Sequence, residues 1–185
     1  PTSYYVLSDV DLLPSEALIP SYLEFPTQPI HLGHRGTRYE VPTNKGKNKG
    51  KKRTFLGGVV SFGKPEFEKA NGYPNNFWGW GGEDDALNHR LNTQHIQVTQ
   101  PDAPVIDLEE LTREEKNQIL KQQEAKEERK WEKVDADTQH WKTNGLSNLE
   151  GSYEILNDSL FKHHENVRHL LVQLNITEAD EKVYA

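Results

Sequence analysis

The sequence predicts an α/β domain, in which strands alternate with helices along the chain. Two short apolar segments, residues 4–14 and 53–63, have the composition of buried strands, and the first is typical of a parallel sheet. Each is followed by a segment that predicts a short helix bounded by proline or glycine, at residues 15–26 and 64–72. The length of 185 residues is that of one ordinary domain. We therefore expect one domain that is large enough to bury a core.

The second half of the chain continues this alternation. Residues 83–93 predict a helix that begins with three acids, a favourable arrangement for the helix dipole. Residues 95–101 alternate polar and apolar side chains as a strand does. Residues 111–134 predict one long, highly charged helix on the surface. A last strand is expected within residues 146–156.

The C-terminal residues are expected to form a helical tail. Residues 159–174 carry apolar side chains at spacings that fit an amphipathic helix. We therefore divide the chain into residues 1–157, which contain the main α/β unit, and residues 158–185, which form the C-terminal helical tail.

Composition argues against several classes of function. The formal net charge is −7 and the pI is about 5.6, which argues against a nucleic acid partner. No segment approaches the roughly 20 apolar residues of a membrane span. Without cysteine, the chain has neither disulfides nor thiolate zinc sites. The basic run at residues 45–53 is interpreted as the end of a polar loop, with an anionic-ligand patch as the alternative. The first residue is proline, so we expect a processed or fragmentary chain.

The segment "SDVDLLP" (8–14) places two aspartates at the end of the first expected strand. Asp9 and Asp11 are two residues apart, so their side chains project to the same side at the carboxyl end of a strand. Neighbouring carboxylates that leave a buried strand need a cation or hydrogen-bond donors nearby. A hard divalent ion such as Mn²⁺ or Mg²⁺ suits these oxygen ligands. A turn in which the aspartates cap backbone amides explains the pair equally well.

The segment "FWGWGGEDDALNHRL" (77–91) carries most of the candidate chemistry. Its tryptophans offer flat apolar faces suited to sugar rings, and its glycines allow a close approach of the backbone to a ligand. Its acids begin a helix, where backbone amides favour the ionised form. Crowding beside an apolar ring can instead raise one pKa, which suits a general base. Core tryptophans beside solvated acids do not explain the segment as a unit. The residues concerned are Trp78, Trp80, Gly81, Gly82, Glu83, Asp84 and Asp85.

These segments resemble the β-1,4-galactosyltransferases. "SDVDLLP", the block at residues 55–91 and "GLSNLEGSYEIL" (145–156) follow one another as in the catalytic domain of that family, and "EERKWEKVD" (127–135) is similar to its xylosylprotein galactosyltransferase branch. The resemblance implies a GT-A-type fold, with a mixed sheet and flanking helices. It also implies a Mn²⁺-dependent (or Mg²⁺-dependent) inverting transfer of a hexose, expected to be galactose, from a UDP-sugar donor to a hydroxyl of a carbohydrate or glycoconjugate acceptor.

The resemblance also implies roles for individual residues. Asp84 would be the catalytic base, and Glu83 would hold acceptor hydroxyls with it. Asp9 would contact the donor and Asp11 would bind the metal. Trp80 would stack at the junction of donor and acceptor. The donor- or acceptor-binding positions are Asp9, Phe55, Gly58, Trp78, Trp80, Gly81, Gly82 and Asp85.

The chain departs from the family in two places. The metal-binding histidine of the family would follow residues 95–101, where this chain reads "DAPVIDLEEL" (102–111) without histidine. Asp107 and Glu109 could replace it as oxygen ligands, although we favour Glu109 and Glu110 as acids in the first turn of the charged helix. The chain also begins at the Asp-x-Asp strand, so we expect the N-terminal nucleotide-binding part to be missing.

Two alternative functions remain open at this point. One is a related inverting transferase that uses another UDP-sugar, such as UDP-GalNAc, UDP-Glc or UDP-GlcA. The other is a catalytically silent relative that binds glycans through Trp78 and Trp80. The resemblance implies the Golgi lumen as the compartment, and the absence of cysteine weakens that inference.

Overall fold

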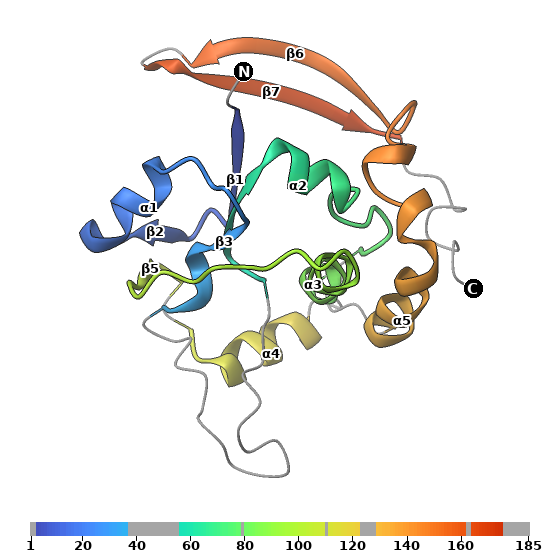
Figure 1. The fold of residues 1–185 in the computed structure, drawn as a ribbon, viewed down its shortest axis with the longest axis horizontal. Coiled ribbons are helices and arrows are strands. Elements are labelled where there is room, and N and C mark those ends of the chain that lie inside the picture. Colours follow the sequence, from blue (N-terminus) through green and yellow to red (C-terminus); the bar gives the residue numbers. More distant parts are fainter. Residues whose placement is uncertain are drawn as a thin grey trace.

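The computed structural model describes residues 3–36, 56–78, 80–109, 111–122, 129–161 and 164–175 (Figure 1). Its central sheet has three antiparallel strands in the order β1, β4, β3, which are Tyr4–Ser8, Val59–Gly63 and Ile30–His31. Every residue of β4 is buried, as expected for the middle strand. The two predicted apolar strands are therefore confirmed, but β1 pairs antiparallel with its neighbour and is only partly buried.

Two apolar cores lie against β4. Val59 belongs to the first, while Val60 and Phe62 belong to the second, because alternate residues of a strand face opposite sides. The other buried members of the first core are Leu12, Leu18, Ile30, Leu32, Ala103 and Val105. The other buried members of the second are Leu56, Ala70, Leu87 and Leu91. Since Leu87 and Leu91 are helical, the second core fixes helix α3 (Glu83–Thr93) to the sheet.

Three predicted helices form where the sequence placed them. The segment after β1 contains a 3-10 turn (Glu16–Leu18) followed by α1 (Ile19–Leu23). Helix α2 (Lys64–Lys69) follows β4 directly and has Pro65 in its first turn, where a missing backbone donor costs nothing. Helix α3 has the predicted bounds.

A second, two-stranded sheet joins β2 (Leu12–Pro14) to β5 (Val105–Asp107), with Leu12 opposite Asp107. The strand predicted over residues 95–101 was wrong: in the described part of the chain, only Thr99 of this segment forms an isolated parallel bridge, to Ile30. A further parallel bridge joins Gly36 to Val105, so the pairing is mixed. Among the described residues, backbone pairing of this segment with residues 29–31 is limited to Thr99, and alternation alone does not determine how far a pairing extends.

The charged segment contains two described helices, α4 (Arg113–Gln122) and α5 (Lys130–His140). The middle of the predicted 111–134 helix, residues 123–128, lies outside the described residues. Helix α5 continues beyond the predicted end and leads through two 3-10 turns, Trp141–Thr143 and Leu146–Asn148. Within the described ranges, no helix has the length and apolar character needed to cross a membrane.

The predicted C-terminal helical tail was wrong. Strands β6 (Tyr153–Phe161) and β7 (His164–Leu174) form an antiparallel hairpin, which arches across one side of the molecule in Figure 1. Leu170, Val172 and Leu174 alternate along β7, so their spacing fits one face of a strand as well as a helix. Pairing with β6 decides between strand and helix, and the apolar spacing of β7 alone does not reveal that pairing.

Candidate active site

A cavity of about 440 Å³ lies where β1, the residue before β4 and the start of α3 meet. Its ionisable lining residues are Asp9 from the end of β1, Glu83 and Asp84 from the first turn of α3, and Tyr73. The antiparallel pairing of β1 with β4, and the packing of α3 on the face of β4, bring these groups together although Asp9 and Asp84 are far apart in the sequence. The two acidic segments singled out from the sequence therefore line one cavity.

Asp84 has the properties of a general base. Its pKa is raised from 3.8 to about 7, first because burial penalises the charged carboxylate. The charges of Glu83, Asp9 and Asp85 raise this pKa further, while the charge of Lys130 lowers it. A carboxyl group with a pKa near neutrality can accept a proton at physiological pH and still drive its removal from a hydroxyl.

Glu83 is arranged to receive a hydrogen-bond donor. Its Oε2 atom is buried and has no hydrogen-bond partner among the described residues. Burial is also the main cause of the raised pKa values of Glu83 and Asp9. A buried acceptor without a donor is costly unless a ligand supplies one, so this oxygen marks a place for a donor such as a sugar hydroxyl.

Gly58 brings Asp9 close to the sheet. The backbone N–H of Asp9 donates to the carbonyl of Gly58 at 2.9 Å, and both residues line the cavity. Gly58 has a φ of +86°, and a Cβ there would lie 2.9 Å from Leu12 Cδ1. The close backbone approach at this glycine is therefore made to Asp9.

Gly82 allows α3 to begin against two other side chains. It is the N-cap of α3 with a φ of +108°. A Cβ at this position would lie 2.5 Å from Phe77 Cε1 and 3.0 Å from Lys130 Cβ. At Gly81, with a φ of +103°, a Cβ would meet Lys130 Nζ at 3.5 Å. The turn formed by Gly81 and Gly82, called the glycine turn below, thus packs against Phe77 and Lys130. The sequence did not indicate this contact with a lysine.

The remaining expected binding residues either do not line the cavity or lie outside the described chain. Trp78 and Trp80 are 37% and 38% exposed, so neither is a core residue, and neither lines the cavity. Asp85 is partly buried in the first turn of α3. Phe55 lies outside the described residues. Tyr73 was missed as a lining residue, although it belongs to the resembling block; burial is the main cause of its raised pKa.

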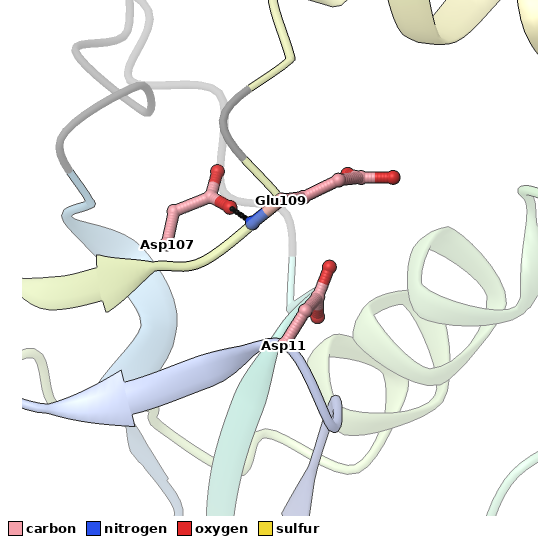
Figure 2. A group of neighbouring side chains, drawn as sticks. All are labelled: Asp11, Asp107 and Glu109. Carbon is pink, nitrogen blue, oxygen red and sulfur yellow. Dashed lines mark hydrogen bonds between the residues drawn. The ribbon is translucent and has the colours of Figure 1, made fainter.

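A second acidic group lies beside Asp9. Asp11, Asp107 and Glu109 each offer a carboxylate oxygen, and these atoms lie within 4.8 Å of one another. Figure 2 shows them where β5 ends beside the turn into β2. The β2–β5 pairing holds the group together, since the Leu108 N–H donates to the Asp11 carbonyl at 2.9 Å. Three partly buried oxygen donors fit a hard divalent cation such as Mn²⁺ or Mg²⁺.

The helix cap that we favoured for Glu109 and Glu110 was wrong. Helix α4 begins at Arg113, and its N-terminus is capped by Thr112 and Glu115. The Thr112 N–H donates to Glu115 Oε2 at 2.7 Å, and the Glu115 N–H donates to Thr112 Oγ1 at 3.2 Å. Glu109 lies outside this cap, and Glu110 lies outside the described residues. The competing interpretation, a carboxylate group with Asp11, is the one that fits the geometry.

The carboxylate group has local partners. Asp107 Oδ1 accepts the N–H of Glu109 at 2.9 Å, which fixes the turn between them. Lys116 Nζ, from α4, donates to Glu109 Oε2 at 2.6 Å. The Lys116 ammonium therefore places one positive charge at the edge of the three carboxylates. A divalent cation bound there would have to attract Glu109 more strongly than this single charge does.

A buried ion pair holds the other end of α3. Arg90 and Asp137 are both 1% exposed, and the guanidinium Nε and Nη2 donate to the two carboxylate oxygens at 2.7 and 2.6 Å. The guanidinium also donates to the carbonyls of Asn71 at 3.3 Å, Gly72 at 2.9 Å and Asn144 at 2.7 Å. This network joins α3 to α5 and so places Lys130, in the first turn of α5, beside the glycine turn.

Comparisons with known proteins identify the family of this chain. A family model described as the N-terminal domain of galactosyltransferase matches residues 37–116. β-1,4-Galactosyltransferase 4 of Cricetulus griseus is 31% identical over 156 residues, which cover 82% of this chain and 40% of the relative. The chain belongs to the β-1,4-galactosyltransferase family. β-1,4-Galactosyltransferase 1 of Mus musculus is 35% identical over 103 residues, 55% of this chain and 23% of the relative. The chain described here thus spans about two fifths of the length of the Cricetulus griseus relative.

Solved structures of the same family share the fold. The catalytic domain of Drosophila β-1,4-galactosyltransferase 7 with xylobiose has a TM-score of 0.63 at 24% identity, covering 97% of this chain and 70% of that chain. A mutant of that enzyme, in complex with manganese, UDP-Gal and xylobiose, has a TM-score of 0.61 at 23% identity. The predicted GT-A-type α/β fold is confirmed.

Proposed function

We propose that this chain carries the catalytic site of an inverting glycosyltransferase that moves a hexose, expected to be galactose, from a UDP-sugar to a sugar hydroxyl. The observation that carries the proposal is the Asp84 carboxyl, whose pKa is raised to about 7 at a cavity that Glu83 also lines, with its buried Oε2 lacking a partner among the described residues. Membership of the galactosyltransferase family supports it. The Drosophila relative was solved with UDP-Gal and xylobiose, which are a donor and a carbohydrate of the expected classes.

The cavity suits a single displacement at the anomeric carbon. The acceptor hydroxyl oxygen forms a bond to the anomeric carbon as the bond from that carbon to the diphosphate oxygen breaks. The hydroxyl proton moves to the Asp84 carboxylate, and the electron pair of the broken bond leaves with UDP. Glu83 Oε2 accepts a hydrogen bond from a neighbouring acceptor hydroxyl and orients the ring. Asp9, which follows β1 and lines the same cavity, faces the donor sugar.

Asp11, Asp107 and Glu109 would hold the metal ion that the family resemblance implies. When bound, Mn²⁺ or Mg²⁺ would offset the negative charge of the leaving diphosphate. The three oxygens within 4.8 Å support this assignment, and they replace the expected histidine with an all-carboxylate set. By the same resemblance we expect the Golgi lumen as the compartment.

Turnover by an Asp84→Asn variant tests the proposed base. UDP release is measured on the protein at its natural length, with UDP-Gal, UDP-GalNAc, UDP-Glc and UDP-GlcA as donors and with Mn²⁺ or a chelator. We expect turnover with UDP-Gal, which the variant lowers by about 10²–10⁴-fold while UDP binding survives, because the amide cannot accept the proton. Asp158→Asn, an exposed acid on the hairpin, is the matched control and should keep wild-type turnover.

The same assay separates the alternatives. Wild-type turnover in Asp84→Asn would contradict the base assignment. Turnover with a different UDP-sugar would support the related transferase. The half-exposed Trp78 and Trp80 favour a silent glycan-binding relative as the second candidate, and glycan binding without turnover of any donor would support it.

Direct metal binding tests the carboxylate group. Titration calorimetry with Mn²⁺ should show Glu109→Gln and Asp107→Asn binding at least about tenfold more weakly than the wild type, since even outer-shell partners of metal ligands are worth that much. Asp102→Asn, an exposed acid whose side chain pairs with Arg35, is the control and should leave binding unchanged. Equal Mn²⁺ affinity in all four proteins would place the ion elsewhere.

A further inference from the structure

Tyr73 lines the acidic cavity, and the proposed displacement does not use it. Its ring packs against the second core, which holds the side chain from the protein side. Burial raises the pKa of its hydroxyl above the ordinary value of 10.0, and the charges of Asp84, Glu83 and Asp9 raise it further, in that order. The hydroxyl therefore stays protonated at neutral pH and is a hydrogen-bond donor among the three acids of the cavity.

The backbone on both sides of Tyr73 is anchored to other elements. Arg90 Nη1 donates to the carbonyl of Gly72 at 2.9 Å. The N–H of Asn75 donates to Asn144 Oδ1 at 3.0 Å. With the ring packed on the core and the flanking residues fixed in this way, the phenol is presented to the cavity in a set place, as a ligand contact requires.

The side chains that line the cavity offer a ligand several hydrogen-bond acceptors and few donors. Ionised carboxylates only accept. Two other lining side chains carry donors, and both are used within the protein. Ser8 Oγ donates to the carbonyl of Asp9 at 3.0 Å, and Asn75 Nδ2 donates to two oxygens of residues 145–148 at 2.8 and 2.9 Å. Among the described lining side chains, the Tyr73 hydroxyl is thus the neutral donor that no contact between described residues uses.

A sugar hydroxyl needs a hydrogen-bond partner of each kind. It donates through its proton and accepts through its oxygen. A hydroxyl that donates to a carboxylate of the cavity still has oxygen lone pairs to satisfy, and a second donor beside the carboxylate completes a chain in which each bond strengthens the next. Tyr73, on which the charges of all three acids act, is placed to be that donor.

We propose that the Tyr73 hydroxyl contacts the substrate, donating a hydrogen bond to a sugar hydroxyl that itself donates to one of the cavity carboxylates. This inference rests on the proposed function, since it takes the acid-lined cavity as the place where the sugars bind. It makes Tyr73 a specificity-determining residue, because a sugar without that hydroxyl leaves both the phenol and the acid without a partner. The hydroxyl belongs to the transferred hexose where the acid is Asp9, and to the acceptor ring where the acid is Glu83 or Asp84.

Tyr73→Phe removes the hydroxyl and keeps the ring, so it tests the contact without emptying the core. Two series of sugars are compared on the protein at its natural length. One is UDP-Gal with its monodeoxy analogues, and the other is the methyl glycosides of xylose and N-acetylglucosamine with theirs. The value of kcat/KM is measured by UDP release and Kd by titration calorimetry. We expect the variant to weaken the parent sugar of one series by roughly two- to tenfold. The analogue that lacks the contacted hydroxyl should respond equally to both proteins, as in a double-mutant cycle, and it identifies the sugar concerned.

Tyr153→Phe, which removes a hydroxyl from a 45%-exposed ring on the hairpin, is the matched control and should change no ligand. A loss that is the same for every analogue would show that the hydroxyl acts on the fold of the site and not on a sugar. No loss for any parent sugar would show that the hydroxyl is unused, and either result would overturn the contact. Analogue-dependent binding without turnover of any UDP-sugar would keep the contact and refute the transferase. Turnover that Asp84→Asn abolishes and Tyr73→Phe leaves unchanged would do the reverse.

Discussion

Helix α3 has buried ionisable groups at both ends, which differ in whether these groups have partners. Near the C-terminal end, Arg90 is buried with Asp137, and its donors reach two carboxylate oxygens and three backbone carbonyls. At the N-terminal end, Glu83 has a buried oxygen with no partner in the part of the chain that the structure describes, and the Asp84 pKa is raised to about 7. Buried charges that are fully paired serve the structure, whereas buried charges without partners indicate where a ligand binds.

The paired end also supports the unpaired one. The ion pair joins α3 to α5, and α5 brings Lys130 against Gly81 and Gly82. Lys130 is the one positive charge that acts on the pKa values of both Glu83 and Asp84 among the described residues. The Arg90–Asp137 pair thus positions the one lysine whose charge lowers the pKa values of Glu83 and Asp84. Substitutions at either end of α3 can test this relation.

The largest effect on stability is expected from breaking the ion pair. Asp137→Ala leaves the Arg90 guanidinium buried without its counter-charge, which should lower the free energy of unfolding by about 3–5 kcal/mol. Urea unfolding at pH 7.5 measures this loss. In a double variant, Arg90→Met with Asp137→Leu, both charges are removed together, and most of the stability should return. A loss below 1 kcal/mol in the single variant would show that water reaches the guanidinium and that the pair is not a structural clamp.

Local patterns in the sequence predicted the acidic end of α3 and not the paired end. Three acids after a glycine pair define the start of α3, and its bounds were predicted correctly. Arg90 and Asp137 are 47 residues apart, and nothing in the spacing of either segment relates them. Lys130 was missed for the same reason, since its position depends on how α5 packs against α3 rather than on any motif.

Two errors in the sequence interpretation have different physical causes. The hairpin was taken for a helix because the apolar spacing of β7 fits both structures, and only its partner strand decides. The cap assigned to Glu109 was avoidable. Thr112 and Glu115 have the spacing of a capping box, which indicates a helix start at the next residue and leaves Glu109 outside it. Applying that rule would have favoured the carboxylate group with Asp11 and Asp107.

The unpaired end should make stability depend on pH. Asp84 has a pKa of about 7 in the folded protein and 3.8 as its ordinary value, so the folded state holds the proton more tightly. Its contribution is therefore fully present below pH 3.8 and is lost as pH rises towards 7 and above. At about 1.4 kcal/mol per pKa unit, the loss should reach about 2–4 kcal/mol.

The difference in unfolding free energy between the wild type and Asp84→Asn isolates this contribution. Urea unfolding at pH 4.5 and pH 8 should show the variant gaining relative to the wild type as pH rises, because the amide does not ionise. Asp158→Asn should follow the wild type at both pH values. A difference that stays constant with pH would mean that Asp84 titrates normally and that this end of α3 is solvated like any exposed helix start.

The smallest effect is expected from removing the cation between the two ends. Lys130 lowers the pKa of Asp84, so Lys130→Ala should raise that pKa and move the acidic limb of the kcat–pH profile to higher pH. Lys130 is partly exposed, so solvent screens its charge, and at pH 6 and saturating acceptor the rate should fall by roughly two- to fivefold. At pH 9, where Asp84 is ionised in both proteins, the rates should be equal. Lys130→Arg keeps the charge and should keep the wild-type limb. A loss of rate that is the same at pH 6 and pH 9 would show that Lys130 acts by packing on the glycine turn and not by its charge.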